Sequence, residues 1–116
     1  MKHEESATQR ACVEWFRMQY PKLALNLIAI PNGGSRRRVE AAIMKAEGVT
    51  AGAADLALFV PSTDAHALFI EMKSATGRQR DSQKAWQQAV EAQGYAYRIC
   101  RSADEFVDII RHYFHT

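Results

Sequence analysis

The sequence predicts a mixed α/β domain in which helices pack on a central sheet. Segments with helical periodicity alternate with short apolar segments, in the order helix, strand, helix, strand, strand, helix, strand, helix. Glycine and proline residues mark many of the boundaries between these segments. The chain has 116 residues, of which 47% are hydrophobic and 24% charged, and this balance fits one globular domain over residues 1–116.

The first half of the chain contains two predicted helices with a strand between them. Residues 6–20 carry apolar side chains at helical spacing, and Pro21 would end that helix. The apolar segment 23–30 precedes a proline–asparagine–glycine–glycine sequence, so we expect a buried strand and then a turn. Ser35 could cap the second helix, which Gly48 would end in a left-handed conformation.

The second half begins with two apolar segments, 55–60 and 67–73. A turn-forming sequence separates them, which predicts a β-hairpin. A helix is then expected to begin at Asp81 or Ser82 and to run to about Gln93, where a glycine follows.

The last strand and the last helix have clear patterns. Residues 95–100 alternate between apolar and polar side chains, as a strand does. Ser102 and Glu105 form an S-x-x-E capping box that would begin a helix. One apolar stripe follows this helix, made by Phe106, Ile109, Ile110 and Tyr113.

The composition argues against a membrane or secreted protein. No segment approaches the roughly 18 apolar residues of a membrane-spanning helix, and the first ten residues lack the apolar core of a secretory signal. Cys12 and Cys100 match no metal-ligand spacing and lie in apolar segments, so we expect buried free thiols in a reducing, cytoplasmic setting. The four histidines form no zinc-like pair.

Basic residues are clustered although the net charge is only +2. Arg36, Arg37 and Arg38 are consecutive. A second group begins at the end of the predicted hairpin and contains Lys73, Arg78, Arg80 and Lys84. Such clusters indicate either a surface for a phosphate backbone or a solvated basic surface, and charge alone does not choose between them.

Two charged residues interrupt the apolar strand 67–73. Glu71 and Lys73 share one face of that strand, because successive side chains point to opposite faces. If the two strands pair as a hairpin, Asp55 at the head of the preceding strand lies beside them. Two carboxylates and a lysine would then form a site for a hard cation, open to water.

Such a site suits phosphodiester hydrolysis. Mg²⁺ prefers oxygen ligands at roughly 2.0–2.1 Å and retains several waters, and it lowers the pKa of a bound water. A lysine beside the ion positions that water or stabilises developing charge. The E-x-K triplet alone is weak evidence, because charged side chains on a strand usually face water. The aspartate on the neighbouring strand makes a metal site a serious alternative to a solvated face.

The succession of these motifs resembles the VRR-NUC domain, a virus-type replication-repair nuclease of the PD-(D/E)xK superfamily. The resemblance runs from about Glu5 to Phe114 and rests on the segments IPNGGSRRR, AEGVTAGAADLALFV and HALFIEMKSATGRQRDSQKAWQQAVEAQGYAYRICRSADEFVDII. It implies a restriction-endonuclease-like core, with a mixed central sheet flanked by helices.

The resemblance also implies a set of site residues. Asp55 and Glu71 would ligate Mg²⁺, or Mn²⁺ in its place, with the Met72 carbonyl as a further ligand. Lys73 would be the catalytic lysine. Gln83 matches a glutamine that the family places against the active site.

A second motif of the family lies near the N-terminus. Glu5 and Gln9 match E-x-x-x-Q and share a helix face, with Glu5 as an active-site acid. Glu4 and Glu14 are rivals for that role.

Two positions depart from the family pattern. Ala54 stands where a proline is usual and Ala29 where a histidine is frequent. Proline supplies no ligand, so the first change leaves the metal chemistry intact, whereas the second removes any role of that histidine toward the substrate. In this family context, DNA contacts are expected from Arg36, Arg37, Arg38, Arg78, Arg80 and Lys84. The aromatic residues expected to pack in the core are Trp86, Tyr95 and Tyr97.

The implied function is that of a metal-dependent DNA endonuclease, specific for branched DNA such as four-way junctions. It would act as a homodimer in a bacterial or phage-infected cell, because two identical sites can make two symmetric cuts. The alternatives are flap, nicking or restriction-like cleavage by the same centre, a DNA-binding module without catalysis, and an unrelated structural protein. The complete set Asp55, Glu71, Lys73 and Gln83 argues against the inactive module.

Overall fold

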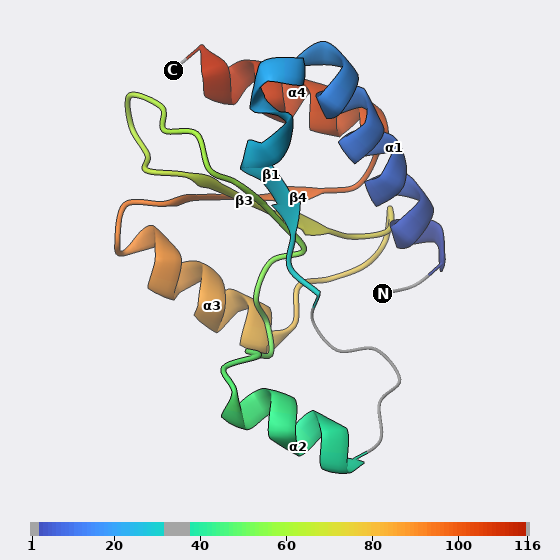
Figure 1. Ribbon diagram of the computed structural model, residues 1–116, viewed down its shortest axis with the longest axis vertical. Coiled ribbons are helices and arrows are strands. Elements are labelled where there is room, and N and C mark those ends of the chain that lie inside the picture. Colours follow the sequence, from blue (N-terminus) through green and yellow to red (C-terminus); the bar gives the residue numbers. More distant parts are fainter. Residues whose placement is uncertain (1–2, 32–37, 116) are drawn as a thin grey trace.

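The computed structural model describes residues 3–31 and 38–115. The elements in chain order are α1 (His3–Gln19), the 3₁₀ helix η1 (Pro21–Asn26), β1 (Leu27–Ala29), α2 (Arg38–Ala46), β2 (Leu56–Leu58), β3 (Leu68–Met72), α3 (Asp81–Glu91), β4 (Ala96–Cys100) and α4 (Ala103–Phe114) (Figure 1). The predicted mixed α/β class and the predicted order of helices and strands are confirmed. Ser35 and the turn at 32–34 lie outside the described residues.

The four strands form one mixed sheet in the order β1-β2-β3-β4. β1 and β2 are antiparallel, and so are β2 and β3, which confirms the predicted hairpin. β4 pairs with β3 in parallel, with Glu71 opposite Ile99 and Phe69 opposite Tyr97. Because β2 runs against β3, the residue that precedes β2 lies beside the end of β3.

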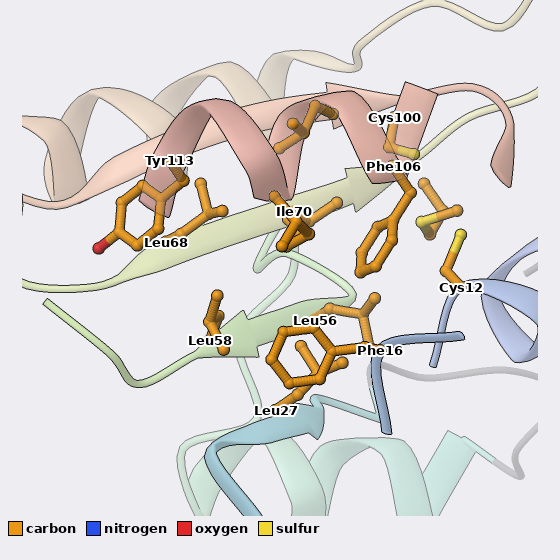
Figure 2. Close-up of a cluster of buried hydrophobic side chains, with 13 residues drawn as sticks. Cys12, Phe16, Leu27, Leu56, Leu58, Leu68, Ile70, Cys100, Phe106 and Tyr113 are labelled. Carbon is orange, nitrogen blue, oxygen red and sulfur yellow. The ribbon is translucent and has the colours of Figure 1, made fainter. Parts of the chain in front are cut away.

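Helices cover both faces of the sheet (Figure 1). α1 and α4 lie on one face, and α3 lies on the other. Figure 2 shows the rings of Phe16 and Phe106 among strand side chains such as Leu56 and Ile70. The apolar stripe predicted for α4 is buried in this cluster at all four positions.

A smaller apolar cluster lies under α3. It contains Ala57, Phe69 and Tyr97, with Trp86 packed against them. The rings of Phe69 and Trp86 have centroids 4.9 Å apart in an edge-to-face arrangement. The prediction that Trp86 and Tyr97 pack in the core is confirmed, and the predicted alternation places Glu71 on this same face of β3.

The prediction of a strand over residues 23–30 is wrong for its first part. Pro21 begins a 3₁₀ helix, whose turn is closed by the Leu23 N–H donating to the Tyr20 carbonyl oxygen at 2.9 Å. Leu25 is 94% exposed, whereas Leu23 packs against the core, so the apolar residues of this segment are only partly buried. The strand itself has only three residues and forms the edge of the sheet, although the flanking Asn26 and Ile30 also make backbone hydrogen bonds to Phe59 and Asp55.

The ends of the helices follow the sequence signals closely. Gly48 and Gly94 have φ values of +105° and +88°, as predicted for residues that end helices. The Ser102 hydroxyl accepts a hydrogen bond from the Glu105 N–H at 3.1 Å, which confirms the cap. The return bond of the predicted capping box differs, because the Glu105 carboxylate accepts from the Arg101 N–H instead of that of Ser102.

The two cysteines are buried free thiols, as predicted, and they come from α1 and β4 (Figure 2). A hydrogen bond with Cys100, together with burial, raises the pKa of the Cys12 thiol. The Cys100 thiol also donates to the Ser102 carbonyl oxygen at 3.2 Å. In the described part of the chain, no helix has the length and apolar character needed to cross a bilayer.

Candidate active site

Three predicted site residues meet where β3 ends. Glu71 lies in β3, Lys73 follows its last residue, and Asp55 directly precedes β2. The Asp55 N–H donates to the Ile70 carbonyl oxygen at 3.1 Å, and the Asp55 Oδ2 accepts from the Met72 N–H at 2.7 Å. The aspartate is therefore fixed to the backbone of β3 by two hydrogen bonds, one on each side of Glu71.

Glu71 is only 3% exposed, whereas Asp55 and Lys73 are half-buried. The site is therefore less open to water than the sequence predicts. Burial and then the neighbouring Asp55 carboxylate raise the pKa of Glu71 to about 8, while the Lys73 ammonium acts in the opposite direction. When both carboxyl groups are ionised, their two negative charges exceed the one positive charge of Lys73, and a divalent cation would offset the difference.

The Met72 carbonyl belongs to the same side of β3 as the aspartate. The Lys73 N–H donates to the Cys100 carbonyl oxygen on β4, whereas the Met72 N–H donates to Asp55. The N–H and C=O of one strand residue point to the same side, so the Met72 carbonyl is directed toward β2. Asp55, Glu71 and this carbonyl are oxygen ligands of the kind that Mg²⁺ prefers.

The site offers few side-chain ligands for a cation. Within residues 3–31 and 38–115, no group of three or more histidine, cysteine, aspartate or glutamate side chains could hold a metal ion. A cation bound to Asp55 and Glu71 would therefore complete its shell with backbone and water oxygens. This is the usual coordination of Mg²⁺, so the residues fit that ion.

Gln83 connects the first turn of α3 to Glu71. Its Oε1 accepts from the Arg80 N–H at 2.8 Å, and its Nε2 donates to the Glu71 Oε2 at 2.9 Å. A backbone N–H can only donate, so the amide oxygen must face Arg80 and the amide nitrogen must face Glu71. Gln83 is 3% exposed, and its predicted place against the site agrees with this contact.

Two further side chains reach Glu71 or its partners, although the sequence does not place them in the site. The Tyr97 hydroxyl lies 3.4 Å from the Glu71 Oε1, and the Gln79 Nε2 lies 3.2 Å from that hydroxyl. Strand alternation predicts the face on which Tyr97 lies. Its position beside Glu71 depends on the parallel register of β3 and β4, for which the sequence offers no signal.

Arg101 is another residue that sequence reasoning missed. Its Nη1 donates to the carbonyl oxygens of Ser74 and Gly77, each at 2.7 Å. These carbonyls belong to the turn directly after Lys73, so Arg101 fixes the chain next to the predicted catalytic lysine.

The N-terminal motif of the predicted site lies in α1. Glu5 is half-buried in the first turn, whereas Glu4 and Glu14 are exposed. Within the described residues, Glu5 does not join Asp55 and Glu71 in a metal-binding group, and its role stays a prediction.

The predicted DNA contacts are only partly within the described residues. Arg36 and Arg37 lie outside them, and Arg38 begins α2. Arg78, Arg80 and Lys84 are exposed, and the last two lie three residues before and one residue after Gln83. Their role toward DNA stays a prediction.

A cavity of about 330 Å³ lies at the other end of the sheet. Its lining includes Leu68 and Ala96, the first residues of β3 and β4, together with Arg98 and His112. None of the predicted site residues lines it. The cavity is therefore separate from the carboxylate site.

Two carboxylates and a lysine thus lie at the end of a hairpin in a mixed sheet. The family whose sequence model matches this chain implies a nuclease of the PD-(D/E)xK type. The sequence model of the VRR-NUC domain matches residues 2–104. The chain belongs to the VRR-NUC family, which confirms the resemblance stated above.

A solved structure described as a VRR_NUC domain protein has the same fold. It matches with a TM-score of 0.85 and 24% sequence identity, over 99% of this chain and 91% of its own. At this identity the likeness shows the fold alone. Among curated proteins, none matches this sequence.

Proposed function

We propose that this protein is a DNA endonuclease that depends on a divalent metal, with Mg²⁺ as the working ion and Mn²⁺ as a substitute. The observation that carries the proposal is the buried Glu71 carboxyl next to Asp55 and Lys73, on a nuclease fold. A buried glutamate beside a half-buried aspartate, with a single lysine near them, is unfavourable for a purely structural site.

Each residue has a distinct task in this mechanism. Asp55, Glu71 and the Met72 carbonyl hold the ion, which when bound lowers the pKa of a water and offsets negative charge on the phosphate. The Lys73 ammonium orients the attacking water or stabilises the charge that develops on the phosphate oxygens. Gln83 keeps Glu71 oriented through the hydrogen bond described above.

The proposed substrate is branched DNA, in particular the four-way junction. The basic residues next to the site, Arg78, Arg80 and Lys84, are suited to phosphate contacts, which fix position without reading base sequence. Recognition would then depend on the shape of the DNA and on the arrangement of two sites in a homodimer.

The surface that we assign to the homodimer is the apolar face of α2. Val39 and Ile43 are one helical turn apart, and they are 69% and 53% exposed. Figure 1 shows α2 apart from the sheet, beyond α3. A nine-residue helix is marginal in water without packing, so this face needs a partner. A second copy is the partner that a two-fold junction and two symmetric cuts require.

The deciding experiment is cleavage of matched linear duplex, flap and four-way-junction DNA in Mg²⁺, Mn²⁺ or EDTA. We expect paired incisions in the junction that need the metal and are lost in Lys73→Ala, with DNA binding retained. Binding without cleavage of any substrate by the unmodified protein would leave a DNA-binding module and refute the endonuclease. Preferential cutting of the flap or the linear duplex would retain the nuclease and reject the junction as its substrate.

A further inference from the structure

We propose that Tyr97 is a positioning residue for the carboxylate of Glu71. Its hydroxyl and the Gln83 amide together set the orientation in which Glu71 meets the metal. This inference rests on the proposed function, because it assigns Glu71 to the metal.

Both oxygens of the Glu71 carboxyl group face a side-chain donor. The Oε1 is 3.4 Å from the Tyr97 hydroxyl, and the Oε2 is 2.9 Å from the Gln83 Nε2. Tyr97 is 6% exposed and Gln83 is 3% exposed, so water competes little with either donor. The donors come from β4 and α3, and turning the carboxyl group would break both contacts. The longer Tyr97 contact is the weaker of the two, and its loss should therefore have a moderate effect.

A chain of hydrogen bonds fixes the direction in which the Tyr97 hydroxyl points its proton. A carboxylate can only accept, so the Glu91 Oε2 turns the Gln87 Nε2 toward itself at 3.3 Å. The Gln87 Oε1 is then left to accept from the Gln79 Nε2 at 2.7 Å. The same Nε2 donates to the Tyr97 oxygen at 3.2 Å, which leaves the single phenol proton for Glu71.

Packing accounts for the ring of Tyr97 but not for its hydroxyl. The ring lies 6.2 Å from that of Trp86 by centroids, and phenylalanine would fill the same space. A buried hydroxyl is unfavourable unless it is bonded. The other buried tyrosine, Tyr113, donates to the Val60 carbonyl oxygen, which is a backbone contact. The Tyr97 hydroxyl instead donates to Glu71, the side chain that we assign to the metal.

The test is Tyr97→Phe, with Tyr95→Phe as the matched control. Tyr95 lies in the same segment and packs against Phe69, with ring centroids 5.4 Å apart. The affinity for Mn²⁺ alone is measured by calorimetry without DNA, and kcat and KM are then measured with junction DNA. We expect Tyr97→Phe to bind Mn²⁺ roughly 10-fold more weakly and to lower kcat with little change in KM for DNA. Tyr95→Phe should leave both measurements unchanged.

A second variant separates positioning from packing. Gln79→Ala removes the donor that orients the Tyr97 hydroxyl, so it should weaken Mn²⁺ binding in the unmodified protein. It should have no further effect when Tyr97→Phe is already present, because it acts through that hydroxyl. Additive losses would overturn the proposal.

The outcomes distinguish this inference from the proposed function. If Glu71→Gln abolishes Mn²⁺ binding while Tyr97→Phe equals the unmodified protein, the role of Tyr97 is wrong and the metal site stands. If Tyr97→Phe and Tyr95→Phe lose Mn²⁺ affinity and kcat equally, the effect comes from packing alone, and the positioning role of Tyr97 is also wrong. If the unmodified protein neither binds Mn²⁺ nor cleaves DNA, the proposed function fails and the role of Tyr97 fails with it.

Discussion

The Glu71 carboxyl group links the stability of the protein to its candidate site. Burial and the Asp55 carboxylate raise its pKa from an ordinary value of 4.5 to about 8 in the folded protein. Between these two pH values the folded protein retains a proton that the unfolded chain has released. The contribution of Glu71 to the free energy of unfolding is therefore fully present below about pH 4.5 and is lost as the pH rises through 8.

The first prediction concerns this titration. In EDTA, we expect the melting temperature to fall between pH 6 and pH 9, and we expect Glu71→Gln to reduce that fall. A pKa difference of one unit corresponds to about 1.4 kcal/mol, so the effect should amount to several degrees. Calorimetry over this pH range measures it, and Asp64→Asn on the exposed turn is the control. Parallel curves for Glu71→Gln and the unmodified protein would show that Glu71 titrates normally.

The loop before β2 and the first turn of α3 form one unit at the scale of elements. Gly52 has φ of +88°, and a Cβ atom placed on it would overlap the carbonyl of Ser82. Gln83, the next residue of α3, holds Glu71, while Asp55 lies three residues after Gly52. The contact between these two backbones therefore sets how the aspartate and the glutamine approach Glu71.

The second prediction compares two glycines with similar backbone angles. Gly48 has φ of +105°, and a Cβ atom there would meet nothing within 4 Å. We expect Gly48→Ala to lower the free energy of unfolding by about 1–2 kcal/mol, the cost of a left-handed alanine. Gly52→Ala should cost roughly 1–3 kcal/mol more, because α3 must also move. It should weaken Mn²⁺ binding as well, whereas Gly48→Ala should not. Urea unfolding and calorimetry measure both effects, and equal behaviour of the two variants would contradict the argument.

At the scale of the whole molecule, local patterns predicted most of the elements. The stripe of α4 and the cap at Ser102 were readable because helix periodicity and capping are properties of neighbouring residues. The strand expected over 23–30 failed at its start, because Pro21 and the backbone bond to Tyr20 favour a 3₁₀ turn over an extended chain. The apolar composition of the segment alone does not distinguish a 3₁₀ turn from an extended strand.

The candidate site was predictable to the extent that it follows from a hairpin. Asp55 and Glu71 come together through the pairing of two strands adjacent in sequence, which the turn between them indicates. Tyr97 joins them only through a parallel register, and Arg101 through contacts across 24 and 27 residues. Such distant contacts depend on how the helices pack on the sheet, and no local pattern specifies them.

The third prediction tests the homodimer that the two-fold substrate suggests. In Ile43→Asp, a charge replaces an apolar side chain on α2 that is 53% exposed in the single chain. Burial of such a side chain contributes roughly 1.5–3 kcal/mol, and a symmetric interface contains it twice, so the dimer should dissociate. Met18→Asp is the control, because Met18 is 77% exposed on α1 and should not affect assembly.

Sedimentation of the metal-free protein measures the mass of the assembly, and junction cleavage shows whether the two incisions remain paired. We expect Ile43→Asp to sediment as a monomer and to convert paired incisions into single nicks, because each chain still carries its own Asp55, Glu71 and Lys73. Met18→Asp should retain the dimer and the paired cuts. If Ile43→Asp still forms a dimer, the interface does not include the apolar face of α2. An unmodified protein that is monomeric even on junction DNA would reject the homodimer, and each cut would then be an independent event of one chain.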